Sequence, residues 1–135
     1  MKSKIFRSDD AEYQKFYADM AAMATAPGLI ELEEEDLAPF KEFTGSVYMG
    51  EAEAAGKHAA EIATKEAVSK AENFASAKEV LLHMAGSSDN VDMSVASGAS
   101  SVLYEIAPDA ELCLGVRLDD TLGKTVRVMV VAKIP

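Results

Sequence analysis

Several features that are common in proteins are scarce or missing from this sequence. Its 135 residues include one cysteine, no tryptophan and eight glycines that never cluster. A single cysteine excludes an intramolecular disulfide, and scattered glycines exclude the glycine-rich loops that cradle phosphate groups. The longest apolar run, near 128–132, is far shorter than the roughly 20 residues of a membrane span. We therefore expect neither a disulfide framework, nor a phosphate-binding loop, nor insertion into a membrane.

Metal ligands and nucleophiles are equally scarce. The two histidines, His58 and His83, are far apart in the sequence, and no cysteine or histidine stands near either at metal-ligand spacing. Cys113 lies between two leucines, which is typical of an inert packed thiol rather than a nucleophile. Met84, Met93 and Met129 are expected in the core, and His83 in or beside the sheet. The sequence predicts no metal and no cofactor held by this chain itself.

Basic residues are outnumbered. Thirteen lysines and arginines against 23 aspartates and glutamates give a formal charge of −10, which repels phosphate backbones and anionic lipids. We therefore expect no nucleic acid or membrane surface as a partner. The N-terminus is positively charged but lacks the apolar stretch of a secretory signal, so a cytoplasmic location is predicted. With 49% hydrophobic residues, a chain of this length can enclose one core.

Hydrophobic spacing predicts an alternation of helices and strands. We expect a helix over 9–24 that ends before Pro27, a second from the acidic run 33–36 to about Phe43, a strand over 45–50 and a long helix over 51–74. A strand over 80–84, a helix to Ile106 capped by Asp89 or Asp92, and two strands over 111–118 and 125–133 follow. The turn-rich link between the last two strands suits an antiparallel pair. The predicted fold is a layered α/β domain, a four-stranded mixed sheet with helices packed on it.

Three motifs, in the same order, resemble those of the C-terminal domain of FtsZ, a relative of tubulin. Residues 27–36 read Pro-Gly-Leu-Ile-Glu-Leu-Glu-Glu-Glu-Asp, where the family has Pro-Gly-Leu-(Ile or Met)-Asn-x-Asp-x-x-Asp. Residues 84–89 resemble the family's Ile-Thr-Gly-Gly-x-Asp, and 122–132 resemble its last strand, with Arg127 at the family's arginine. The resemblance implies an N-terminal helical segment, residues 1–26, that is the remnant of the family's central helix. An FtsZ C-terminal-like domain, residues 27–135, follows it.

The resemblance also implies where a site would lie. FtsZ binds GTP in a separate domain with a glycine-rich loop, which this sequence lacks, so GTP is expected only through a partner's domain. In the family, the loop after the central helix enters the next subunit's nucleotide site. By position, the two catalytic aspartates fall on Glu33 and Asp36, which would act only in trans. The residues expected to contact a partner are Gly28, Leu29, Glu31, Glu33, Glu34 and Asp36.

Two readings of the acidic run remain open. As a site, its carboxylates would orient water toward a γ-phosphate, although Glu33 is one methylene longer than aspartate and Glu31 replaces a neutral amide. As structure, the run would only favour the start of a helix and solubility. An arginine in a strand, such as Arg127, is more often a salt-bridge partner than a catalytic group.

The sequence therefore predicts a non-catalytic protein that acts by protein–protein contact in FtsZ-type or tubulin-type filament assembly or its regulation. Its partner would be an FtsZ-type GTP-binding domain or filament, and it can also form a homo-oligomer. The alternative is a self-associating small-molecule binding domain, because the layout is similar to that of the trimeric chorismate-mutase-like folds. No basic cluster for an anionic metabolite stands out in the sequence.

Overall fold

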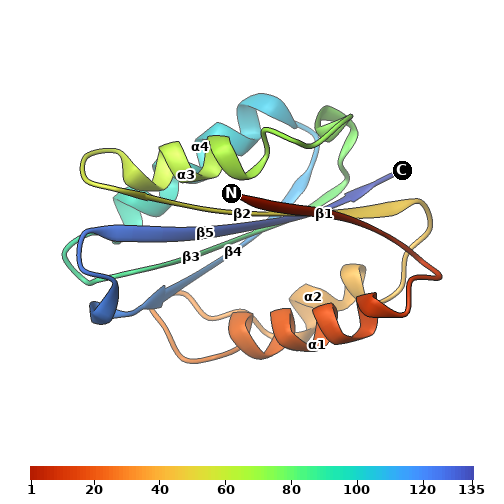
Figure 1. Cartoon of the computed structure of the whole chain (residues 1–135), viewed down its shortest axis with the longest axis horizontal. Coiled ribbons are helices and arrows are strands. Elements are labelled where there is room, and N and C mark those ends of the chain that lie inside the picture. The colour runs from red at the N-terminus through yellow and green to blue at the C-terminus, as the bar shows by residue number, and fades with distance from the viewer.

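A five-stranded mixed sheet lies between two layers of helices in the computed structural model, which describes residues 1–135. Figure 1 shows α1 and α2 on one face of the sheet and α3 and α4 on the other. The elements in chain order are β1 (Lys2–Arg7), α1 (Glu12–Ala24), α2 (Glu34–Lys41), β2 (Ser46–Ala55), α3 (Ala59–Ala67), β3 (Glu79–Gly86), α4 (Met93–Ile106), β4 (Glu111–Leu118) and β5 (Thr125–Ile134), with short 3-10 turns at Phe74–Ser76 and Asp120–Leu122. The predicted fold class is confirmed, with five strands in place of four.

The fifth strand is β1, which the sequence did not predict. It pairs antiparallel with β2 at one edge of the sheet. Of its six residues only Phe6 is buried, so the strand has no alternating hydrophobic pattern that would identify it. Pairing with β2, rather than intrinsic preference, specifies its conformation. Residues 1–26 thus contain a strand as well as the predicted helix.

The last two strands are not neighbours, so the antiparallel pair predicted for them is wrong. The strand order is β1-β2-β5-β3-β4, with β5 antiparallel to β3 and β4 parallel to β3. All of β3 after its first residue is buried, as expected for an inner strand of a sheet whose two faces are both covered by helices. α4 forms the crossover between the parallel strands β3 and β4, as parallel pairs require.

The long helix predicted over 51–74 is also wrong. Its first five residues continue β2 to Ala55, where Glu53 lies opposite Arg127 of β5. Gly56 and His58 then adopt positive φ angles of 85° and 60°, and α3 occupies only Ala59–Ala67. Alanines and glutamates in 51–55 favour a helix. The alternation that buries Ala52 and exposes Glu53 instead fits a strand, which here pairs with β5.

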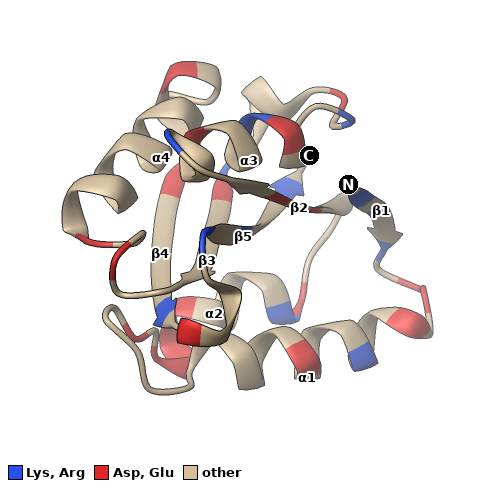
Figure 2. Ribbon diagram, turned by 60° about the vertical axis from the view of Figure 1, so that its left-hand side comes forward, with Lys and Arg blue, Asp and Glu red and all other residues tan.

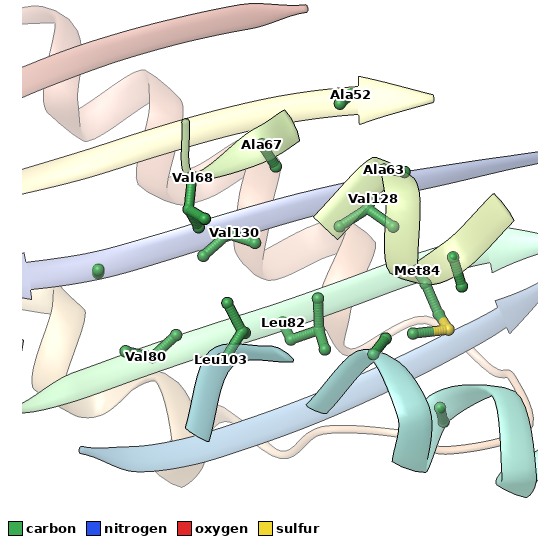
Figure 3. Packing of buried hydrophobic residues seen from close by; sticks show 14 of the residues in the cluster. Ala52, Ala63, Ala67, Val68, Val80, Leu82, Met84, Leu103, Val128 and Val130 are labelled. Carbon is green, nitrogen blue, oxygen red and sulfur yellow. The ribbon is translucent and has the colours of Figure 1, made fainter. Parts of the chain in front are cut away.

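The larger of two hydrophobic clusters fills the space between the sheet and helices α3 and α4. Figure 3 shows small side chains of α3, such as Ala63 and Ala67, lying over the valines and leucines of β3 and β5. These alanines let α3 approach the sheet closely, and the Tyr48 hydroxyl donates to the Ala67 carbonyl at 2.5 Å. Met84 is buried here as predicted, whereas Met93 at the start of α4 is 60% exposed, so its predicted place in the core is wrong.

The second cluster fixes α1 and α2 on the opposite face. Leu37 and Phe40 of α2 are fully buried in it, together with Met20 of α1. The Tyr13 hydroxyl donates to the Phe40 carbonyl, which ties the two helices together. No helix of the structure is both long enough and apolar enough to span a bilayer.

Candidate functional site

The acidic segment, residues 27–36, connects α1 to α2 along the outer edge of β4. Ile30 forms an isolated antiparallel bridge with Val116 of β4. The Ile30 N–H donates to the Val116 carbonyl at 3.1 Å, and the Val116 N–H donates to the Ile30 carbonyl at 2.9 Å. An edge strand otherwise presents unpaired backbone groups, so these two bonds seat the segment on the sheet.

Gly28 lets the segment come this close to β4. A Cβ at this position would overlap the Val116 carbonyl oxygen and lie 3.1 Å from the Arg117 Cα. Both are backbone atoms of a hydrogen-bonded strand, and they cannot move aside cheaply. The glycine is therefore a steric requirement for the bridge at Ile30.

The acidic segment is also tied back to the end of α1. At the end of α1, the Thr25 hydroxyl donates to the Ala21 carbonyl at 2.7 Å. The Leu32 N–H donates to the Ala24 carbonyl at 3.2 Å, and the Leu32 side chain is buried in the second cluster. Backbone hydrogen bonds at Ile30 and Leu32 thus tie the segment to β4 and to the end of α1.

Two of the carboxylates expected at the site make local hydrogen bonds. A Glu31 carboxylate oxygen accepts the Gly28 N–H at 3.3 Å. The Asp36 carboxylate accepts the Glu33 N–H at 2.9 Å, and the Asp36 N–H donates to the Glu33 backbone carbonyl at 3.0 Å. This reciprocal pair satisfies groups that the first turn of a helix leaves free. The structural interpretation of the acidic run thus accounts for Asp36.

The remaining carboxylates face solvent. Glu33 precedes α2, and Glu34 and Glu35 open its first turn, where negative charge meets the positive end of the helix dipole. Figure 2 shows the acidic patch at the start of α2 on the outside of the molecule. Glu33 and Asp36 are brought together at this helix start, with Glu33 exposed and Asp36 half-buried.

Two exposed leucines flank this patch. Leu29, within the acidic segment, is 43% exposed, and Leu118, at the end of β4, is 44% exposed. Because Ile30 pairs with Val116, Leu29 and Leu118 lie at the same end of the molecule. The sequence did not single out Leu118. An apolar residue as the last of a strand, directly before the Asp119-Asp120 turn, is the signal that would have found it.

Cys113 of β4 lies beneath the start of α2. Its thiol donates to the Asp36 carbonyl at a sulfur-to-oxygen distance of 3.5 Å. Burial, and then the nearby carboxylates of Asp36, Glu79 and Glu111, raises the pKa of the thiol. A raised pKa disfavours the reactive thiolate, in agreement with the prediction of an inert thiol.

Two polar side chains of the inner strands have structural roles. His83 is 4% exposed, and burial followed by the charge of Arg117 lowers its pKa to about 4. Arg127 donates to Glu53 at 2.9 Å with both side chains well exposed. Both residues thus agree with the structural roles predicted for them, a histidine packed in the sheet and an arginine in a salt bridge.

These features define a layered α+β domain with an acidic segment seated on the edge of a mixed sheet. The sequence profile of the FtsZ family's C-terminal domain matches residues 45–133. The chain therefore belongs to the FtsZ family and contains its C-terminal domain. The cell division protein FtsZ of Caulobacter vibrioides is 29% identical in an alignment of 110 positions that covers 78% of this chain and 22% of that protein.

Solved structures agree with this assignment. An empty FtsZ dimer from M. jannaschii superposes with a TM-score of 0.72 at 24% identity, over 82% of this chain and 33% of that one. A single-substitution mutant of M. jannaschii FtsZ gives a TM-score of 0.74 at 22% identity, over 91% of this chain and 39% of that one. The chain thus spans between about a fifth and two fifths of the length of these relatives.

Proposed function

We propose that this domain acts by protein–protein contact in the assembly of FtsZ-type filaments or in its regulation. The acidic segment would dock on the GTP-binding domain of an FtsZ-type partner. When added as an isolated domain, the chain would present only one of the two longitudinal surfaces of a subunit and would cap a filament end. The observation that carries the proposal is the seating of the acidic segment, which two backbone hydrogen bonds tie to β4 and a third ties to α1, with its carboxylates and Leu29 exposed.

Preorganisation supports a docking role for this segment. A loop that is already ordered loses little conformational entropy when it binds, so more of its contact energy appears as affinity. Leu29 and Leu118 supply apolar area at the same end of the molecule, and the desolvated centre of an interface is commonly apolar. The surrounding carboxylates would select a basic or metal-neutralised partner surface.

The chemistry that this surface can supply to a partner is narrow. GTP would be held by the partner's domain, and Glu33 is the exposed carboxylate that can orient water toward the γ-phosphate. Asp36 is half-buried and already caps α2. We therefore propose that it orients the segment and also contributes to its negative charge. The extra methylene of Glu33 relative to aspartate displaces its oxygens by about an ångström, an error that costs about 100-fold in rate.

Mixing the chain with polymerising FtsZ from Caulobacter vibrioides tests the proposal. We expect an equimolar amount to lower light scattering in the presence of GTP, because capped filaments stop growing. Leu29→Ser should abolish this effect. Ile62→Ser is the matched control, since Ile62 is a comparably exposed residue of α3, 50% exposed, on the other face of the sheet. Unchanged scattering with the unmodified chain, or equal loss with both variants, would contradict the docking role.

GTP turnover in the same mixtures tests the role of the carboxylate. If Glu33 contributes in trans, Glu33→Asp should raise turnover and Glu33→Gln should lower it, while neither changes the scattering. Glu105→Gln, on the exposed end of α4, is the control. If GTP turnover is the same with all three variants, Glu33 takes no part in hydrolysis, and the docking role is unaffected.

A further inference from the structure

A hollow lies at the start of α1, the end that does not join the acidic segment. It has a volume of about 710 Å³ and lies between the start of α1 and the link from α2 to β2. Helix α1 has 13 residues, so about 20 Å separate its two ends. In Figure 1 the β1–α1 turn and the α2–β2 link lie at the same end of the molecule, and residues of both line the hollow.

Three aromatic rings line the hollow. Tyr13 and Phe43 meet edge to face, with centroids 4.8 Å apart, and the Tyr13 and Tyr17 centroids are 6.4 Å apart. The Tyr13 hydroxyl donates to the Phe40 carbonyl, which fixes that ring. Tyr17 and Phe43 are half-buried. The cluster is therefore a preformed aromatic wall with part of its surface open.

Negative charge surrounds these rings. The lining includes the carboxylates of Asp9, Asp10 and Glu42 and one cation, Lys41, which leaves two net negative charges. Asp10 is held in place because its carboxylate accepts the Arg7 N–H at 2.8 Å. Fixed carboxylates beside aromatic faces repel anions. An apolar ligand would bury these charges without giving them a partner, which costs free energy.

The same combination attracts organic cations. An ammonium or guanidinium group within about 6 Å of a ring centroid is drawn to the negative face of the ring, and a carboxylate adds charge-assisted hydrogen bonds. A bare metal ion does not fit, because no group of three or more histidine, cysteine, aspartate or glutamate side chains is placed to hold one. A net charge of −10 would also steer a basic partner toward this chain.

We propose that this aromatic hollow binds a cationic side chain, a lysine ammonium or an arginine guanidinium, presented by another polypeptide. Tyr17 and Phe43 face the cation, and Asp9 and Glu42 pair with its N–H groups. This contact uses other residues than the docking of the acidic segment and does not depend on it. It gives the domain a second attachment point on a basic protein surface, at the opposite end of α1.

Nuclear magnetic resonance titration of the ¹⁵N-labelled full chain tests the proposal with three probes. Nα-acetyl-arginine methylamide represents the side chain in a polypeptide, its citrulline analogue is a neutral isostere, and tetramethylammonium is a small free cation. At roughly 20 mM probe, well above the millimolar dissociation constant of a single such contact, the arginine probe should give saturable shifts at Asp9, Tyr17, Glu42 and Phe43. The citrulline probe should give none. Binding of tetramethylammonium at least tenfold tighter than the arginine probe would assign the hollow to small cations and overturn the polypeptide proposal.

Variants separate the aromatic and charge contributions. Tyr17→Leu should weaken binding of the arginine probe about fivefold, and Lys41→Gln should strengthen it about twofold because a competing cation is removed. Tyr104→Leu, on the exposed face of α4, is the control. Equal shifts with the citrulline probe, shifts confined to other residues, or an unchanged affinity in Tyr17→Leu would overturn the proposal.

Discussion

Replacing Gly28 with alanine tests how the acidic segment is held. The new Cβ would collide with the Val116 carbonyl and lie 3.1 Å from the Arg117 Cα, both backbone atoms of β4. The segment must move off the strand edge, which breaks the two hydrogen bonds between Ile30 and Val116. Each bond contributes about 1 kcal/mol net, so we expect a loss of about 2 kcal/mol in the free energy of unfolding.

The assay is urea denaturation followed by circular dichroism, together with thermal unfolding. For a domain of 135 residues, about 2 kcal/mol corresponds to a fall of roughly 7 °C in Tm. Amide hydrogen exchange at Ile30 and Val116 should accelerate even if the rest of the sheet keeps its protection. This local readout distinguishes release of the segment from general destabilisation.

Gly98→Ala is the matched control. Gly98 lies within α4, and a Cβ there would meet the end of the Glu61 side chain, which can swing away. Alanine in a helix interior is favoured over glycine by up to about 1 kcal/mol, so this variant should be neutral or more stable. Unchanged stability and unchanged exchange at Ile30 in Gly28→Ala would refute the reasoning about the close approach to β4.

Three further outcomes follow from the second cluster and the buried titratable groups. Phe40→Ala should lower the free energy of unfolding by about 3 to 5 kcal/mol, measured by urea titration, because a fully buried ring leaves a cavity; a cost below about 1 kcal/mol would contradict this packing. The pKa of His83 is lowered to about 4 by burial and by the charge of Arg117, so the unfolded state binds more protons between pH about 4 and pH 6.5. The free energy of unfolding should therefore rise with pH across this window, by up to about 3 kcal/mol, and fall as pH drops toward 4. His83→Gln should rise less steeply over the same window, and equal slopes would exclude His83 as the cause. Cys113, whose thiol pKa is raised by burial and neighbouring carboxylates, should react with iodoacetamide near pH 8 far more slowly in the folded chain than in urea, and equal rates would contradict its burial.

Much of the fold could be predicted because several local signals agreed with the tertiary structure. The acidic run and the reciprocal Glu33–Asp36 pair mark the start of α2. Asp92 caps α4, with its carboxylate accepting the Val95 N–H. The motif that ends at Asp36 was recognisable because its residues have physical roles. Gly28 allows the close approach to β4, and the acidic residues cap α2.

Elements whose conformation depends on distant partners could not be predicted. β1 has one buried residue, and only its pairing with β2 makes it a strand. The segment 51–55 favours a helix by composition but completes the ladder with β5. The aromatic hollow near Tyr17 brings together residues far apart in the chain, so no local pattern indicates it.

Titrating the ¹⁵N-labelled chain with the isolated GTP-binding domain of Caulobacter vibrioides FtsZ tests the central claim most directly. The account predicts that chemical shifts change along residues 28–36 and at Leu118, and that Leu29→Ser removes those changes. Shift changes confined to α3 and α4, or no change with the domain in excess, would contradict it.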